Sequence, residues 1–146
     1  MTPTSSAAAY FLARIDGAAM RVVPYDPGAH RAVARQHARL VGDAALSLLP
    51  AFVLEGSDPP AYCILQGNKI DWLYAPGNGA RMLRFIRRHM RRAGAARVLA
   101  NVSVDRRELP ATVARRLNFW LGRARFRVAA VDYHPWGVVL RLGHPL

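Results

Sequence analysis

The residues with the clearest capacity to bind a ligand come directly after the apolar segment 70–75. Residues 77–79 are Gly-Asn-Gly, and these residue types tolerate a left-handed backbone. A helical pattern follows at once, and the first N–H groups of a helix carry partial positive charge without an internal acceptor. Arg81 and Arg84 lie in the first two turns of that helix. Strand, glycine turn and basic helix together favour an anion, such as a phosphate, at the start of the helix.

A different interpretation of the same stretch stays open. A G-x-G sequence after a strand is a weak signal, because glycine turns also serve simply to connect a strand tightly to a helix. The arginines of the helix form a stripe at three-to-four spacing: Arg81, Arg84, Arg88, Arg91 and Arg92. Such a stripe is usually a solvated face. Like charges at this spacing repel by roughly 0.2–0.5 kcal/mol per pair, however, and a bound anion would relieve that repulsion.

Net charge is concentrated in one half of the chain. The formal charge is +12, and residues 1–71 are neutral, with five arginines and Lys69 against six acids. Residues 72–146 hold fifteen arginines against Asp105, Glu108 and Asp132. A GC-rich coding sequence would explain why arginine outnumbers lysine twenty to one, but not why the charge lies in one half. A polyanionic partner, either a nucleotide-type cofactor or a nucleic acid, explains the distribution better.

The composition is that of a globular protein. A chain of 146 residues buries enough surface to be stable without a disulfide or a metal. The single cysteine, Cys63, excludes an internal disulfide, and its position in an apolar run is typical of an inert core thiol. No segment has the pattern of a leader or a membrane span. We therefore expect one soluble, cytoplasmic domain over residues 1–146, with residues 1–8 disordered.

Local patterns predict an alternation of strands and helices. Strands are expected at 10–15, 18–25, 51–56, 61–67, 69–75, 96–104, 126–134 and 136–142, and helices at 27–42, 43–50, 78–93 and 108–122. The three strands within 51–75 form an antiparallel meander, and residues 69–104 form a β-α-β crossover. The sequence therefore predicts an α/β fold with a mixed sheet.

The order of these elements and the glycine turn together resemble the GNAT-type acetyltransferases. That family has a strand, a loop of the form Q/R-x-x-G-x-G/A, and a helix that opens with small and leucine-like residues. Gly77, Asn78 and Gly79 match the G-x-G part, and the helix opens ARML. The resemblance covers residues 20–142, mostly as the order of elements.

Two positions depart from the family pattern. Tyr74 stands where the loop begins with glutamine or arginine in the family, and the stretch before the glycines is short. The segment LNFWLGRARFRV resembles the family's last helix and strand, but the usual tyrosine is absent from it. The phosphate-binding loop is therefore recognisable but trimmed.

The resemblance implies a GNAT-like, mostly antiparallel mixed sheet with helices on both faces, splayed between the strands at 70–75 and 98–104. Acetyl-CoA, or a related acyl-CoA, would lie in the splay as acyl donor, and an amine would attack its acyl group directly. The pyrophosphate would meet the start of the helix, and the pantetheine arm would pair with the strand. The cofactor-binding residues implied are Leu73, Tyr74, Ala75, Gly77, Asn78, Gly79, Ala80, Arg81 and Arg84.

Direct acyl transfer to an amine needs a base for the amine and an acid for the leaving thiolate. Asp71 is the candidate base, because the family often carries a carboxylate on this strand and an apolar run would raise its pKa. An alternative of equal weight is that Asp71 is simply an exposed aspartate at the edge of the sheet. Ser103 and Tyr133 are the candidate acids in place of the absent tyrosine. The alternative for Ser103 is that it simply faces solvent. The alternative for Tyr133 is that it packs as an aromatic residue of the core or its rim.

The histidines show no metal-ligand spacing with a third ligand, so no metal is expected. His30 and His37 share one face of the first helix and are expected at the surface, although they would also suit a substrate entrance. His89 is expected at a packing boundary and His134 in a turn.

Nucleic-acid binding is the second function that these residues support. The arginines within 84–92, 106–107, 115–116 and 122–127 would contact phosphates, and Trp120 or Trp136 would stack on bases. At the level of the fold there is also an analogy to the phage DNA-modification protein Mom, which is thought to act on adenine in DNA. In a third, weaker interpretation the basic surface serves solubility alone. The acceptor, the acyl group and the oligomeric state are left open.

Overall fold

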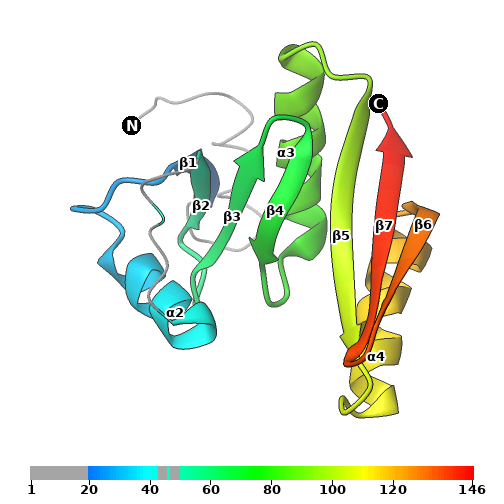
Figure 1. Ribbon diagram of the computed structural model, residues 1–146. Coiled ribbons are helices and arrows are strands. Elements are labelled where there is room, and N and C mark those ends of the chain that lie inside the picture. The colour runs from blue at the N-terminus through cyan, green and yellow to red at the C-terminus, as the bar shows by residue number, and fades with distance from the viewer. Residues whose placement is uncertain (1–19, 43–45, 47–49) are drawn as a thin grey trace. The chain divides into compact units, whose positions relative to one another are not determined.

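The computed structural model of the chain describes residues 20–42, 46 and 50–146. The expectations for residues 1–8, the strand at 10–15 and most of the helix at 43–50 fall outside this described part. Its elements, in chain order, are β1 (Arg21–Pro24), α2 (Arg31–Val41), β2 (Ala51–Glu55), β3 (Ala61–Gln66), β4 (Lys69–Tyr74), α3 (Gly79–Arg92), β5 (Arg97–Asp105), α4 (Pro110–Leu117), the π-helix η2 (Asn118–Arg123), β6 (Arg127–His134) and β7 (Gly137–Pro145) (Figure 1).

The strands form a mixed sheet in the order β1-β2-β3-β4-β5-β7-β6. Antiparallel pairing joins β1 to β2, β2 to β3, β5 to β7 and β7 to β6. The pair β4–β5 is parallel, with Lys69 opposite Leu99 and Ile70 opposite Ala100. Since α3 connects these two strands, the predicted β-α-β crossover is confirmed. The predicted α/β fold class with a mostly antiparallel sheet is confirmed as well.

Contacts group the chain into two compact units. The N-terminal unit contains Met1–Leu65 and Trp72–Met82, and the C-terminal unit contains Gln66–Asp71 and Leu83–Leu146. Both β4 and α3 therefore contribute residues to each unit. The expectation of a single domain stays a prediction.

The N-terminal unit has a core between α2 and the strands β2 and β3. The buried residues of this core are Val33, Leu46, Ala51, Val53, Tyr62 and Ile64. α2 ends at Gly42, whose φ of +83° is a conformation that glycine adopts at little cost, and the Gly42 N–H donates to Ala38 O at 2.8 Å. Cys63 is fully buried, and burial raises the pKa of its thiol to about 12. The predicted inert core thiol is confirmed.

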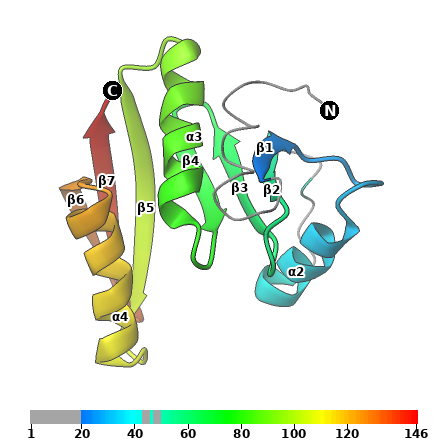
Figure 2. The same ribbon diagram turned by 180° about the vertical axis from the view of Figure 1, so that it is seen from behind.

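The C-terminal unit is built on the antiparallel strands β5, β7 and β6. In β5 every second residue from Val98 to Val102 is buried and the residues between are exposed, as period-two alternation requires. Leu83, Ile86 and Met90 of α3 are also buried. α3 and α4 lie on the same face of this part of the sheet (Figure 2).

The last helical segment differs from the predicted single helix at 108–122. α4 starts with Pro110 in its first turn, as predicted, but the backbone changes to the π-helix η2 at Asn118. The segment ends with Ala124 N–H bonded to Phe119 O at 2.8 Å and Arg125 at a φ of 60°. The left-handed Arg125 stops the helix, a role that sequence patterns assign to glycine or asparagine rather than arginine.

Candidate anion-binding turn and its surroundings

The connection from β4 to α3 contains a tight turn over residues 75–78. The Asn78 N–H donates to Ala75 O at 2.9 Å, which closes the turn, and Pro76 and Gly77 occupy its centre. Gly77 has a φ of +71°. A proline followed by a residue of positive φ is what a type II turn requires, so glycine at this position has a backbone reason. The Asn78 side chain donates to Pro76 O at 3.3 Å and braces the turn.

The first turn of α3 follows directly. Gly79 is its first residue, and Met82 N–H donates to Asn78 O at 3.0 Å. The N–H groups of Gly79 and Ala80 precede the first intrahelical bond, so helix geometry provides them no acceptor. The first turn contains no acidic residue, and Ala80 is exposed. This end of α3 therefore offers an anion backbone donors and no competing carboxylate of its own.

The two arginines predicted to support this turn lie differently. Arg81 is half-buried, and its Nη1 lies 2.7 Å from Met20 Sδ, so this guanidinium is directed toward the start of β1. Arg84 is exposed and belongs to the part of α3 in the C-terminal unit. Leu73, Tyr74 and Ala75, the strand residues predicted to pair with a pantetheine arm, are all half-buried.

The three predicted catalytic residues all belong to the C-terminal unit, and their side chains are exposed. Asp71 is exposed because its neighbour Ile70 takes the buried position in β4, so the carboxylate does not lie in the apolar surroundings that the sequence predicted for it. Ser103 stands opposite Val139, and Tyr133 opposite the adjacent Val138. Because alternate residues of β7 face opposite sides, Ser103 and Tyr133 point to opposite faces of the sheet, and the structure does not bring them together.

A buried polar cluster in the N-terminal unit was missed by the sequence analysis. His37 on α2 is 4% exposed, and its Nδ1 lies 2.7 Å from the hydroxyl of the fully buried Tyr62. Trp72 meets the His37 ring edge-on at 5.2 Å, and Tyr74 lies 5.9 Å from the Tyr62 ring. Burial lowers the pKa of His37 and raises the pKa of Tyr62 to about 12, so both groups are neutral near pH 7.

The expectation of surface histidines is therefore wrong for His37. One signal in the sequence points to its burial: His37 comes four residues after Val33, and residues at that spacing share one helix face. His30 is also withdrawn from solvent and precedes the first residue of α2 rather than lying within the helix. His89 is exposed and stacks on Phe85 at 5.6 Å.

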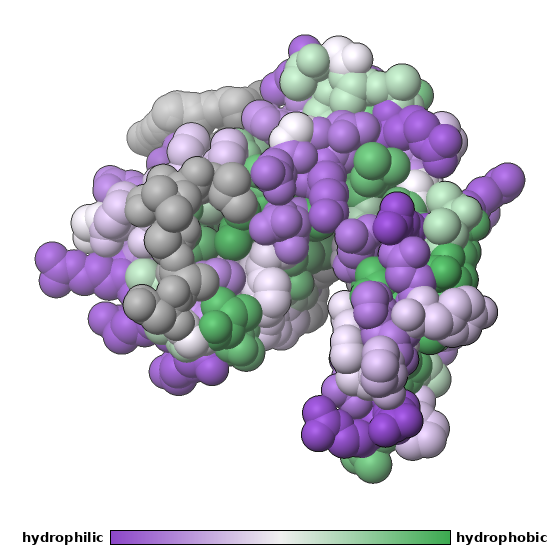
Figure 3. Space-filling model, in the orientation of Figure 1, coloured by the Kyte–Doolittle hydropathy of each residue, from purple (hydrophilic) through white to green (hydrophobic). Residues whose placement is uncertain are grey.

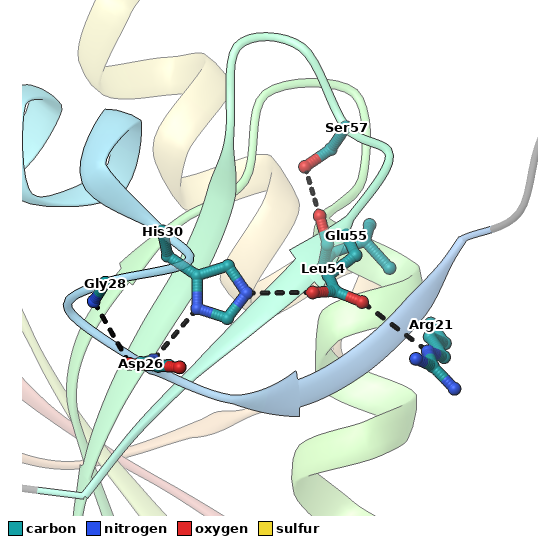
Figure 4. A network of polar contacts seen from close by, with 7 residues as sticks. All are labelled: Arg21, Asp26, Gly28, His30, Leu54, Glu55 and Ser57. Atoms are coloured by element: carbon teal, nitrogen blue, oxygen red, sulfur yellow. Dashed lines mark hydrogen bonds and ion pairs between the residues drawn. The ribbon is translucent and has the colours of Figure 1, made fainter.

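His30 connects the loop before α2 to the strand β2 (Figure 4). The Asp26 N–H donates to His30 Nδ1 at 2.9 Å, so the proton of the neutral ring is on Nε2, which donates to Glu55 Oε2 at 2.9 Å. Arg21 Nε reaches the other carboxylate oxygen at 3.5 Å. The hydrogen bond from His30 is the main reason why the pKa of Glu55 is lowered. Both ring nitrogens of His30 and both carboxylate oxygens of Glu55 have partners within the protein, so we interpret this network as a loop anchor.

The comparisons with known proteins find no family model, curated protein or solved structure that matches this chain. Among the residues that the structure describes, no helix combines the length and the apolar composition needed to span a membrane. Within the same residues, no three histidine, cysteine, aspartate or glutamate side chains gather as a set of metal ligands.

Proposed function

We propose that the chain is an acyl-CoA-dependent N-acyltransferase, which moves an acetyl or related acyl group from CoA to an amine. The observation that carries this proposal is the tight Pro76-Gly77 turn between β4 and α3, followed by a first turn of α3 that contains no acidic residue. A diphosphate placed there would accept hydrogen bonds from backbone N–H groups and lie at the positive end of the helix dipole. The crossover β4-α3-β5 is the arrangement on which the GNAT resemblance rests, and it supports the same proposal.

The proposed reaction forms one bond and breaks one. The amine nitrogen attacks the thioester carbonyl carbon, the carbon–sulfur bond breaks, and the thiolate takes up a proton while the new amide nitrogen loses one. Asp71 is the proposed base, and Ser103 or Tyr133 the proposed acid. All three are exposed, so bound substrate would have to exclude water from any of them that acts directly. A cytoplasmic location goes with this proposal, because the donor is an intracellular metabolite.

The test is thermal unfolding with and without about 1 mM acetyl-CoA, since a ligand that binds only the folded state raises the midpoint. The critical variant is Ala80→Glu. A carboxylate in the first turn of α3 interacts favourably with the helix dipole, by about 0.3–1 kcal/mol, but repels a phosphate at the same N–H groups. The variant should therefore keep its stability and lose the shift with acetyl-CoA.

The chain offers a matched control in α4. Ala111 is exposed and is the second residue of α4, as Ala80 is of α3, so Ala111→Glu makes the same charge change at the equivalent helix position. This control should retain the shift. No stabilisation of the unchanged protein, or equal loss in both variants, would contradict CoA binding at the turn. Release of free CoA thiol with a panel of amines then tests the transfer itself, and Asp71→Asn tests the proposed base.

A further inference from the structure

The charges of the C-terminal unit are strongly unbalanced. It holds fifteen basic residues against four acids, whereas the N-terminal unit, with its residues outside the described part included, holds six against five. Three of the four acids are already paired within the unit: Asp105 with Arg107, Glu108 with Arg116, and Asp132 with Arg141. Little negative charge is left to compensate the remaining cations.

Ten exposed arginines of this unit form no ion pair among the described residues: Arg84, Arg88, Arg91, Arg92, Arg97, Arg106, Arg115, Arg123, Arg125 and Arg127. Uncompensated surface cations at this density attract polyanions and repel one another when none is bound.

Three of these arginines, Arg123, Arg125 and Arg127, form what we call the arginine turn. Arg87 of α3 donates from Nη2 to the carbonyl of Ala124, between the first two of them. The Arg87 guanidinium also lies 5.9 Å from the centre of the buried Phe126 ring. These contacts hold the turn next to α3, where Arg88 and Arg91 are exposed. Exposed arginines far apart in the sequence therefore lie on two elements that contact each other.

Arg125 occupies an unfavourable backbone conformation. Its φ is 60°, and Phe126 N–H closes the end of η2 by donating to Trp120 O at 2.9 Å. Glycine is the residue that adopts this position at a helix end without strain. An arginine in its place is less stable than glycine would be, and such an outlier is a reason to look for a function of the side chain.

Aromatic side chains are exposed at the other end of β6, in what we call the aromatic tip: Tyr133 on one face of the strand, and His134 with Trp136 on the other. Tyr133 is 82% exposed and Trp136 40% exposed. His134 stacks on Trp136 with the rings 4.8 Å apart and 9° from parallel. Figure 3 shows strongly hydrophilic residues at this lower end of the β5–β7 strands. Exposed aromatic rings offer faces on which planar groups of a ligand can stack.

The aromatic tip is also held firmly. Arg106 N–H donates to Trp136 O at 3.0 Å, which joins the tip to the β5–α4 loop. A Cβ on Gly137 would lie 2.0 Å from the carbonyl oxygen of Val104, so only glycine lets the hairpin approach β5 this closely. The rings are therefore presented on a fixed backbone, which reduces the entropy lost when a ligand stacks on them.

We propose that the C-terminal unit binds single-stranded nucleic acid along β6, with phosphates on the arginine turn and bases stacked on the aromatic tip. β6 joins the two sites, and its eight residues span about 25 Å. Seven of these eight residues are exposed, so the path between the sites is open to a ligand. A single strand fits better than a duplex because only unpaired bases offer a face to exposed rings, whereas both offer phosphates.

The experiment measures fluorescence anisotropy of a labelled oligodeoxythymidine of about 20 nucleotides, and of a duplex of equal length, without CoA. Tyr133→Ala should weaken binding of the single strand about tenfold and leave its salt dependence unchanged. Arg125→Gly should weaken binding and reduce the slope of log K against log salt by about 0.7. Arg35→Ala, which removes an exposed arginine from α2 in the N-terminal unit, is the matched control and should change neither.

Three outcomes would overturn the proposal. The first is no binding of the single strand at about 50 mM salt, where phosphate contacts are strong. The second is a duplex that binds as tightly as the single strand together with an unchanged affinity in Tyr133→Ala, which would indicate binding by charge alone. The third is an equal loss in Arg35→Ala and Arg125→Gly, which would indicate diffuse attraction rather than a site. Melting temperatures of the variants show whether each is folded, and none should fall. Because CoA is absent, the result is independent of the acyl-transfer test.

Discussion

The two units use their polar residues in opposite ways. In the N-terminal unit His37 and Tyr62 are buried and bonded to each other, and His30 joins Glu55 to the loop before α2. In the C-terminal unit most of the arginines point into water without a carboxylate partner. Buried polar groups are stable only when they are paired, whereas exposed cations remain available for a ligand. The polar residues of the first set therefore stabilise the fold, whereas the arginines of the second set are available to bind a ligand.

The largest effect should come from separating the buried pair. Tyr62→Phe removes the hydroxyl and leaves His37 Nδ1 buried without a partner, so we expect a loss of about 1–3 kcal/mol in the free energy of unfolding. Adding His37→Leu to this variant should recover part of the loss, since no unsatisfied group then remains. Urea denaturation of Tyr62→Phe, His37→Leu and the double variant measures the coupling. If the double variant is simply the sum of the two single losses, the pair does not hold the N-terminal core together.

The burial of His37 beside Tyr62 predicts that the free energy of unfolding depends on pH. Burial lowers the pKa of His37 below its ordinary value of 6.5, so the folded state binds fewer protons than the unfolded state. The contribution to stability is complete above pH 6.5 and is lost as the pH falls below it, with a slope of at most about 1.4 kcal/mol per pH unit. Unfolding curves between neutral and mildly acidic pH, compared with His37→Gln, check this. A slope that persists in His37→Gln would assign the effect to another group.

In the C-terminal unit, the acid to compare with the buried His37–Tyr62 pair is Glu108, which is paired with Arg116. The hydrogen bonds from Arg116 lower the pKa of Glu108 to about 2, below the ordinary value of 4.5. Stability from this pair is present above pH 4.5 and is lost as the pH falls toward 2. Glu108→Gln should cost about 1 kcal/mol at neutral pH and flatten the acid limb of the stability profile. An unchanged acid limb would show that the pair contributes nothing, as for many surface ion pairs.

The smallest expected effect has the opposite sign. Arg125→Gly relieves a left-handed arginine, so it should stabilise the protein by about 0.5–1 kcal/mol. Arg123→Gly, at the last residue of η2, is the control and should not stabilise. Thermal unfolding measures both. A destabilised Arg125→Gly would mean that the side chain supports the fold, and the contrast between structural and binding residues would fail at this position.

Most of the fold was predictable from the sequence because the residues at the ends of helices and strands have strong backbone preferences of their own. Gly42 ends α2 where the helical pattern ends, Pro110 opens α4, and Pro76-Gly77 separates β4 from α3. Each of these depends on the backbone preference of one or two residues and needs no distant partner. The left-handed Arg125 could not be predicted in this way, since arginine has no preference for that conformation.

The candidate sites were only partly predictable. The anion-binding turn and the excess of arginine in the second half are visible in the sequence, because both are local or additive properties. The sequence does not show that Asp71 is exposed, that Ser103 and Tyr133 point to opposite faces, or that His37 is buried against Tyr62. Those facts depend on strand register and on which helix face meets the sheet.

The sequence alone therefore determined the order of the elements, the glycine turn and the unequal charge of the two halves. Only the tertiary structure decided which polar groups are buried and which cations remain unpaired. It also brought the arginine turn beside α3 through Arg87 and Ala124, thirty-seven residues apart, and placed the aromatic tip at the far end of β6. The physical reason is that burial and charge pairing are properties of neighbours in space, and those neighbours are assembled only when distant segments of the chain pack together.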